Sequence, residues 1–143
     1  MSSADQKRWE LGFTADRRWQ ESGELAGDRL LLARLGSDGA LLLAAGIREL
    51  LTNLERHGAP DSADARLSFD VTQRKLRLEI PGNPFNSVDH ARSATEGFLS
   101  RFHVMLKEDG VDWSWSFKDK SNCIEFSLSD ARFWIEPEEN GDE

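Results

Sequence analysis

The sequence predicts a two-layer α/β (α+β) sandwich, in which a mainly antiparallel sheet is covered on one face by helices. Two observations lead to this fold class. Four short segments alternate apolar and polar residues, as strands with one buried face do. Two longer segments repeat their apolar residues with the period of a helix, and each is followed by a glycine. The apolar faces of the strands and helices can therefore cover one another.

The four alternating segments predict two antiparallel hairpins. Their connections, residues 72–75 (TQRK) and 118–122 (KDKSN), are short and polar, as hairpin turns are. Two earlier runs, Arg29 to Leu35 and Arg8 to Phe13, could add edge strands. The apolar positions of the four segments are Leu67, Phe69 and Val71; Leu76, Leu78 and Ile80; Val111, Trp113, Trp115 and Phe117; and Ile124, Phe126 and Leu128.

The two helical segments frame the first hairpin. The first begins near Ser37 or Asp38, either of which could cap it, and ends at Gly58. The second ends at Gly110. The apolar stripe of the first contains Leu43, Ile47, Leu50, Leu51 and Leu54, and that of the second contains Phe98, Leu99, Phe102, Met105 and Leu106.

The length and composition fit one ordinary domain. A chain of 143 residues with 38% hydrophobic content can bury a core without a metal or a disulfide. We divide it into an N-terminal extension with a potential edge strand (1–28), the main domain (29–135) and an acidic tail expected to be disordered (136–143). The large apolar residues just before the tail, Phe133 to Ile135, should dock on the body or on a partner.

Charge and targeting signals exclude several classes of protein. A net charge of −8 argues against binding to a nucleic-acid backbone. The single cysteine, Cys123, cannot form an internal disulfide, and no Cys/His cluster has zinc-ligand spacing. The N-terminus lacks the apolar core of a secretion signal, and no apolar run approaches the roughly 20 residues that cross a bilayer. We therefore expect a cytoplasmic protein without membrane insertion.

A polar stripe is the strongest candidate site. In the stretch RELLTNLERHG, residues 48–58, Glu49, Asn53 and His57 recur every four residues along one line of the first helix. This flank should face the loop PGNPFNS, residues 81–87. A carboxylate and a carboxamide one turn apart can hold a hydrated magnesium ion or polarise a water, and the small Gly46 would let a ligand approach. A solvated helix flank is the alternative interpretation.

These residues resemble the N box of the GHKL ATPase superfamily, which includes the catalytic domains of bacterial sensor histidine kinases and the anti-sigma-factor serine kinases. That motif has a Glu, an Asn four residues later, a basic residue four beyond, and then Gly or Ala, matching Glu49, Asn53, His57 and Gly58. The resemblance covers about residues 29–129 and implies a Bergerat-like sandwich that uses ATP and Mg²⁺. It implies that Asn53 is the metal ligand, that Glu49 is the catalytic residue, and that His57 lies near the phosphates or ribose.

The chain departs from the family pattern after the second hairpin strand. The family has an Asp there that contacts adenine and a Gly soon after, whereas this chain has Gly82 or Asn83 at the first place and Pro84 at the second. The glycine-rich lid over the phosphates is reduced to Gly97. Asp89 could take over the adenine contact. The resemblance therefore implies a weakened nucleotide site in which Gly82, Asn83 and Gly97 are the remaining cofactor-binding positions.

Three functions follow from these patterns. The first is a regulatory protein-interaction module in bacterial signalling, a pseudokinase of two-component or anti-sigma-factor type with a degenerate, weakened or lost ATP site. The alternative is an active Mg-ATP-binding protein serine kinase or histidine kinase catalytic domain. The third is an unrelated α+β binding domain. The expected partner is a protein, with a homodimer left open, and no phosphoacceptor helical hairpin precedes Arg29.

Overall fold

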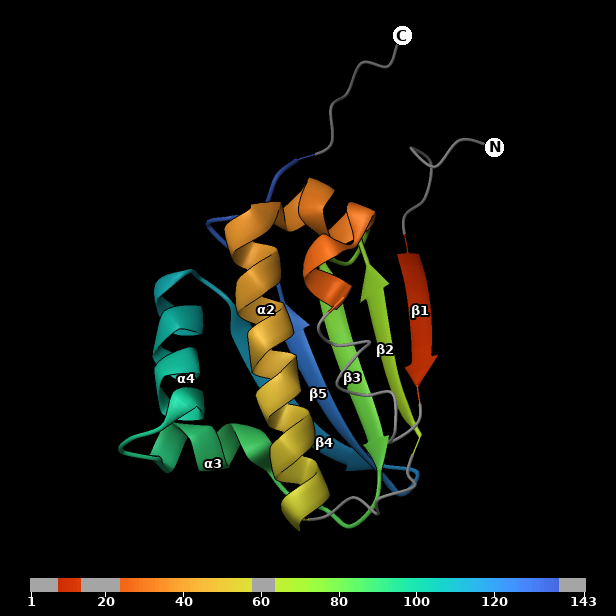
Figure 1. Ribbon diagram of the computed structural model, residues 1–143, viewed down its shortest axis with the longest axis vertical. Coiled ribbons are helices and arrows are strands. Elements are labelled where there is room, and N and C mark those ends of the chain that lie inside the picture. The colour runs from red at the N-terminus through yellow and green to blue at the C-terminus, as the bar shows by residue number, and fades with distance from the viewer. Residues whose placement is uncertain (1–7, 14–23, 58–63, 137–143) are drawn as a thin grey trace, which may run out of the picture.

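The computed structural model describes residues 8–13, 24–57 and 64–136. These residues form a five-stranded antiparallel sheet in the order β1-β2-β3-β5-β4, with helices on one face (Figure 1). In chain order the elements are β1 (Arg8–Phe13), the 3-10 turn η3 (Leu25–Gly27), α2 (Arg29–His57), β2 (Ala65–Asp70), β3 (Lys75–Pro81), α3 (Ser87–Ser93), α4 (Phe98–Glu108), β4 (Asp112–Lys118) and β5 (Ser121–Ser127). The predicted two-layer α+β sandwich is confirmed.

Both predicted hairpins are present. β2 pairs with β3 and β4 pairs with β5, and the core face of the second hairpin sets Trp113 opposite Phe126. Asp119 and Lys120 have φ angles of 53° and 62°, which are the positive values that a tight two-residue hairpin turn requires. β1 is the edge strand predicted for residues 8–13, and it pairs with β2.

The predicted edge strand at residues 29–35 is wrong, because these residues form the first turns of α2. Leu31 and Leu35, one helical turn apart, are both buried against the core. Asp28 caps the helix, since its Oδ1 accepts a hydrogen bond of 3.0 Å from the backbone N–H of Leu31. Gly36, with φ of 72°, interrupts the helical geometry just before the expected start at residues 37–38.

The complete α2 has 29 residues and is long and apolar enough to cross a membrane by length and composition alone, which the sequence patterns did not lead us to expect. A core helix passes the same test, so this is weak evidence. In the structure its apolar stripe packs on the sheet. The buried residues of α2 are Leu31, Leu35, Gly39, Ala40, Leu43, Ala44, Gly46, Ile47, Leu50, Leu51 and Leu54.

The second helical segment is confirmed as α4, which lies beside α2 on the sheet (Figure 1). Its Phe102 is fully buried, with ring centroids 5.4 Å from Trp113 and 6.1 Å from Phe126. α3 was not predicted as a helix. It begins after Asn86, whose side chain accepts a hydrogen bond from the backbone N–H of Asp89, a normal N-cap.

The C-terminal segment docks on the body, as one of the two sequence-based alternatives proposed. Phe133 packs against Gly39, where an added Cβ would lie 2.7 Å from its ring. The ring of Trp134 meets Phe69 edge-on at 6.3 Å, and the backbone N–H of Ile135 donates to the carbonyl of Arg34. Residues 137–143 of the expected acidic tail lie outside the described residues.

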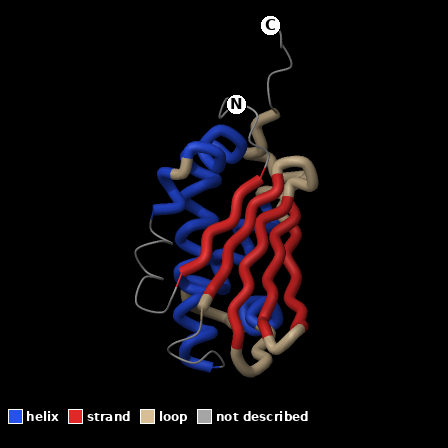
Figure 2. The backbone as a smooth tube through the Cα atoms, turned by 90° about the vertical axis from the view of Figure 1, so that its right-hand side faces the viewer, coloured by secondary structure: helices blue, strands red, loops and turns tan. Residues whose placement is uncertain are grey.

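The helices leave one face of the sheet uncovered (Figure 2). This open face carries the polar residues of each strand. The sheet therefore has one buried face and one solvent-exposed face, as the alternating pattern predicted.

Candidate functional site

The predicted polar stripe lies on the last two turns of α2. The side chains of Glu49 and Asn53 are partly buried, and that of His57 is exposed. Among the residues that the structure describes, neither Glu49 nor Asn53 has a side-chain hydrogen bond or ion pair. Gly58, the fourth position of the motif, lies outside the described residues. Two unpartnered oxygen-bearing side chains therefore stand one turn apart.

His57 connects this stripe to the loop after β3. Its ring stacks on that of Phe85 at a centroid distance of 4.6 Å and an interplanar angle of 16°. His90 of α3 completes the group, 5.4 Å from Phe85 and 6.0 Å from His57. We call these three residues the aromatic cluster. At His57 the flank of α2 thus faces the loop, and a side chain of the loop occupies the position against the imidazole ring.

The side chain of Asn122, on β5, anchors the same loop. This side chain is fully buried, and its Oδ1 accepts hydrogen bonds of 2.9 Å from the backbone N–H of Phe85 and from the indole N–H of Trp115. Its Nδ2 donates to the carbonyl of Asn83 at 2.8 Å. The backbone N–H of Gly82 donates to the carbonyl of Lys120 at 3.0 Å. Gly82 and Asn83, both predicted to bind the cofactor, are thus tied to the β4–β5 hairpin.

Gly46 does not open a path for a ligand, so that prediction is wrong. A Cβ at this position would lie 2.0 Å from a ring carbon of Phe102. Gly46 itself is buried, and the missing side chain makes room for the Phe102 ring between α2 and α4. The small residue therefore serves helix packing.

The remaining predicted nucleotide contact, Gly97, precedes α4. Its φ of 99° is a backbone conformation that residues other than glycine rarely adopt, so the glycine is needed for the backbone conformation at this position. α4 begins at Phe98, and Gly97 is exposed. Asp89, the alternative adenine contact, lies in the first turn of α3 and is also exposed.

His103 of α4 has a structural role. Its Nδ1 accepts a hydrogen bond of 3.0 Å from the indole N–H of Trp113. Burial lowers the pKa of His103, and the positive charges of Arg92 and Lys107 lower it further. The neutral imidazole is the form that can accept this bond.

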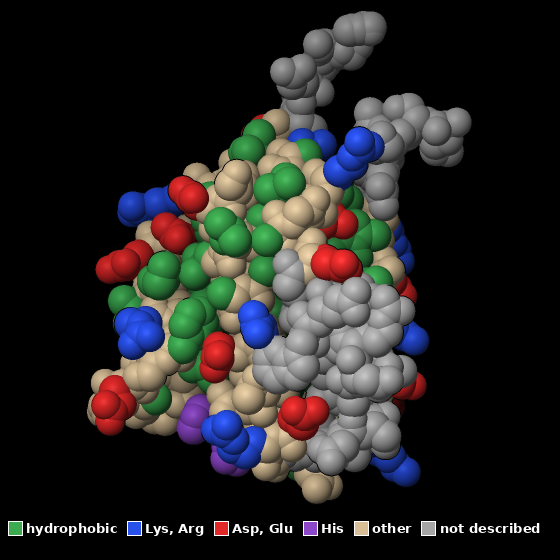
Figure 3. Space-filling view, viewed as in Figure 1, with side chains coloured by type: hydrophobic (Ala, Val, Ile, Leu, Met, Phe, Trp, Pro, Cys, Tyr) green, Lys and Arg blue, Asp and Glu red, His purple; other side chains and the backbone are tan. Residues whose placement is uncertain are grey.

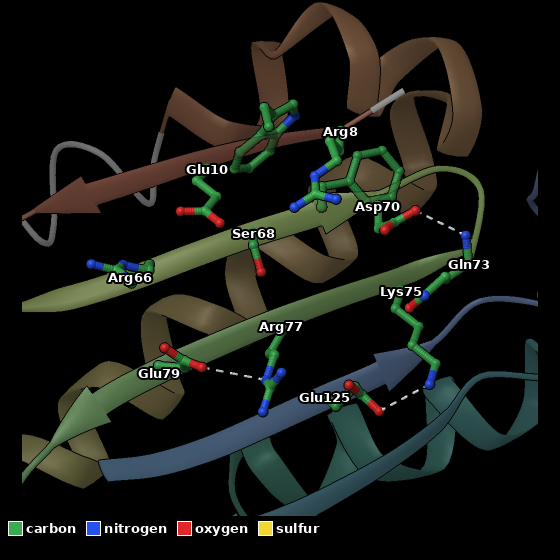
Figure 4. Close-up of a pocket in the computed structure, with 12 residues that line it drawn as sticks. Arg8, Glu10, Arg66, Ser68, Asp70, Gln73, Lys75, Arg77, Glu79 and Glu125 are labelled. Atoms are coloured by element: carbon green, nitrogen blue, oxygen red, sulfur yellow. Dashed lines mark hydrogen bonds and ion pairs between the residues drawn. The ribbon is translucent and has the colours of Figure 1, made fainter. Parts of the chain in front are cut away.

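Several hollows lie away from the stripe. One of about 240 Å³ lies on the open face of the sheet, where charges of opposite sign alternate between neighbouring strands (Figure 4). Arg77 stands at its centre, with its Nε 3.5 Å from the Oε2 of Glu79. Burial alone lowers the pKa of Arg77, but contacts with Cys123, Glu79 and Glu125 outweigh it and raise the pKa. A second ion pair on this face joins Lys75 to Glu125, with 3.4 Å between Nζ and Oε1.

A larger hollow of about 700 Å³ lies between α2 and α4, and its lining is mostly apolar. Leu41 and Met105 on its walls are 57% and 45% exposed, and apolar side chains gather over the helices in the space-filling view (Figure 3). Exposed apolar surface of this kind is typical of protein–protein contacts.

A magnesium ion would find limited protein ligands here. The structure contains no group of three or more His, Cys, Asp or Glu side chains that could hold a metal, within the part of the chain it describes. Mg²⁺ keeps several waters and commonly takes only one or two protein oxygens together with phosphates. The side chains of Glu49 and Asn53 fit that limited role.

No family model matches the chain, and no curated protein is similar to it in sequence at a significant level.

The sequence reasoning missed Asn122 and Phe85. A signal for Asn122 exists, because it lies two and four residues before Ile124 and Phe126, on the inward side of the same strand. A polar residue in a core-facing position is a candidate for a buried hydrogen-bonding role. Phe85 carries no comparable signal, since a single apolar residue in a Pro/Asn-rich loop is common.

Proposed function

We propose that this chain is a cytoplasmic signalling module of the histidine-kinase-like ATPase type, in which the nucleotide site is weakened or lost and regulation occurs through a protein partner. The proposal draws on the resemblance of residues 48–58. It is supported by the two-layer α+β sandwich, in which α2 stands in the chain between the strand β1 and the β2–β3 hairpin.

The main support for a weakened or lost nucleotide site is the packing of the loop at residues 82–86. Phe85 stacks on His57, and Asn83 is held by Asn122. A nucleotide approaching His57 would have to displace the Phe85 ring and disturb a buried hydrogen-bond network. No carboxylate is present at residue 82 or 83 to accept from the adenine amino group, so binding would lack the specificity that such a contact gives.

One observation favours the second candidate, an active Mg-ATP-binding kinase. Glu49 and Asn53 are partly buried, lie one turn apart on α2 and have no hydrogen bond or ion pair among the described residues. In phosphoryl transfer, charge neutralisation by magnesium and positioning of the phosphates supply most of the catalysis. In this candidate Asn53 would hold the ion and Glu49 would orient the attacking group.

Isothermal titration with a non-hydrolysable ATP analogue, with and without Mg²⁺, separates the two. We expect no heat of binding at millimolar analogue for the wild type. Magnesium-dependent binding at micromolar affinity that Asn53→Ala abolishes would replace the proposal by the second candidate. Thr52→Ala is the matched control, because it alters the adjacent residue of the same helix.

A gain-of-function variant tests the family origin of the site. Asn83→Asp combined with Phe85→Ala restores a carboxylate and removes the stacked ring. The Asn83 side chain is exposed, and only its backbone carbonyl serves Asn122, so the acid is compatible with the fold. Magnesium-dependent nucleotide binding by this variant, absent from the wild type, would support a decayed ATP site. Failure to bind while the variant remains folded would favour the unrelated α+β domain.

A further inference from the structure

β4 lies at one outer edge of the sheet. This strand ends the sheet, and in the part of the chain that the structure describes it pairs with β5 alone. Natural edge strands usually carry a charge, a proline or a bulge that prevents another strand from adding. Residues 113–117 of β4, with the sequence WSWSF, have no charge and no proline, and their ladder to β5 is unbroken. Between the charges at its two ends, Asp112 and Lys118, this edge therefore lacks the usual protective features, and of the described elements α3 also contacts the strand.

The side chains of β4 divide cleanly between the two faces of the sheet. Asp112, Ser114, Ser116 and Lys118 lie on the open face and are exposed. Trp113, Trp115 and Phe117 lie on the helix side, and their exposure increases along the strand. Trp113 is 8% exposed and Phe117 is 38% exposed. The second half of the strand thus presents aromatic surface beside an unpaired backbone edge.

The sequence of β4 is self-complementary in the antiparallel direction. If two copies pair with Trp115 at the centre, Asp112 of each lies opposite Lys118 of the other. The same register places Ser114 opposite Ser116, Trp113 opposite Phe117, and Trp115 opposite itself. Opposite charges, paired hydroxyls and paired aromatics are the cross-strand combinations that stabilise antiparallel sheets. A shift by two residues in either direction removes the pairing of Asp112 with Lys118.

We propose that two copies of this chain associate through β4 in this register, with a two-fold axis at Trp115 and a continuous sheet across both copies. A two-fold contact of this type uses the same patch on each subunit. Because the axis is perpendicular to the sheet, the helices of both copies lie on the same side.

The opposite edge of the sheet matches itself only over a shorter length, because a register centred on Trp9 of β1 sets Arg8 opposite Glu10 but pairs only residues 8–10 of the described strand. On β1, self-pairing centred on Glu10 would set two glutamates directly opposite each other, and like charges in that position are destabilising. The charge pattern therefore favours β4 over β1 as the self-associating edge.

The dimer should be weak. A seam of seven residues per copy gives about six to eight backbone hydrogen bonds and buries less surface than a permanent interface. We expect a monomer–dimer equilibrium that shifts over the concentration range from about 10 μM to about 1 mM.

Sedimentation equilibrium of the full chain over this range tests the proposal. Asp112→Lys and Lys118→Asp each place like charges opposite one another at both ends of the seam, and each should weaken the dimer about tenfold. The double variant restores two opposite-charge pairs and should return the dissociation constant to the wild-type value. Asp64→Lys, at an exposed site next to β2, controls for the change in net charge that Asp112→Lys makes.

The outcomes are distinct. A wild-type dimer that is weakened by each single variant and restored by the double variant supports the proposed seam. A monomer at every concentration overturns it, and so does a dimer whose dissociation constant is unchanged by both single substitutions. A double variant as weak as the single variants would overturn the register. Circular dichroism checks that each variant is folded. We expect folding to be retained because both side chains are exposed.

Discussion

Replacing Asn122 with alanine should destabilise the protein by about 3 kcal/mol. The side chain is 0% exposed and makes three hydrogen bonds of 2.8 to 2.9 Å. Its loss would leave the N–H of Phe85, the indole N–H of Trp115 and the carbonyl of Asn83 without their partner. Each stranded group costs about 1 to 3 kcal/mol, and we use about 1 for each because water can reach the surface loop. For a chain of this length that corresponds to a fall of about 10 °C in Tm.

Urea unfolding followed by tryptophan fluorescence measures this free energy. Asn83→Ala is the matched control, because its side chain is exposed and only its backbone carbonyl takes part. The control should remain within about 0.5 kcal/mol of the wild type. An Asn122→Ala variant that is equally close to the wild type would refute the view that this residue anchors the loop.

Three further predictions concern the core, a histidine and the C-terminal segment. Gly46→Ala should cost about 2 to 3 kcal/mol in urea unfolding, because the added Cβ overlaps Phe102; a neutral result would contradict the packing described. The folded pKa of His103 lies below 6.5, so the free energy of unfolding should decrease as the pH falls below 6.5 towards that pKa, and His103→Gln should flatten this dependence. Equal slopes would show that other groups dominate. Ending the chain after Ser129 should lower Tm by several degrees, since residues 133–135 pack on α2 and the sheet; an unchanged Tm would contradict docking.

The sequence was sufficient to predict the fold class because the period of two is clean in four segments and one face of the sheet is wet. It failed at residues 29–35, where successive leucines satisfy a strand and a helix equally well. Two features favour the helix here: the N-cap by Asp28 and the burial of Leu31 and Leu35, one turn apart. Both depend on the folded structure.

The candidate site was predictable only in part. The period of four places Glu49, Asn53 and His57 on one line of α2, and the sequence shows this directly. His57 stacks on Phe85, and the ring of Phe102 occupies the space beside Gly46. Both contacts depend on how the loop and α4 pack onto that helix. Contacts between segments far apart in the chain cannot be obtained from local periodicity.

The most direct test of a weakened or lost nucleotide site is a ¹H–¹⁵N chemical-shift titration of the full chain with a non-hydrolysable ATP analogue and Mg²⁺. A weakened or lost site predicts no saturable shifts below about 1 mM analogue at the amides of residues 49–57 and 82–86. Saturable, magnesium-dependent shifts in both segments at micromolar analogue, lost in Asn53→Ala, would contradict it.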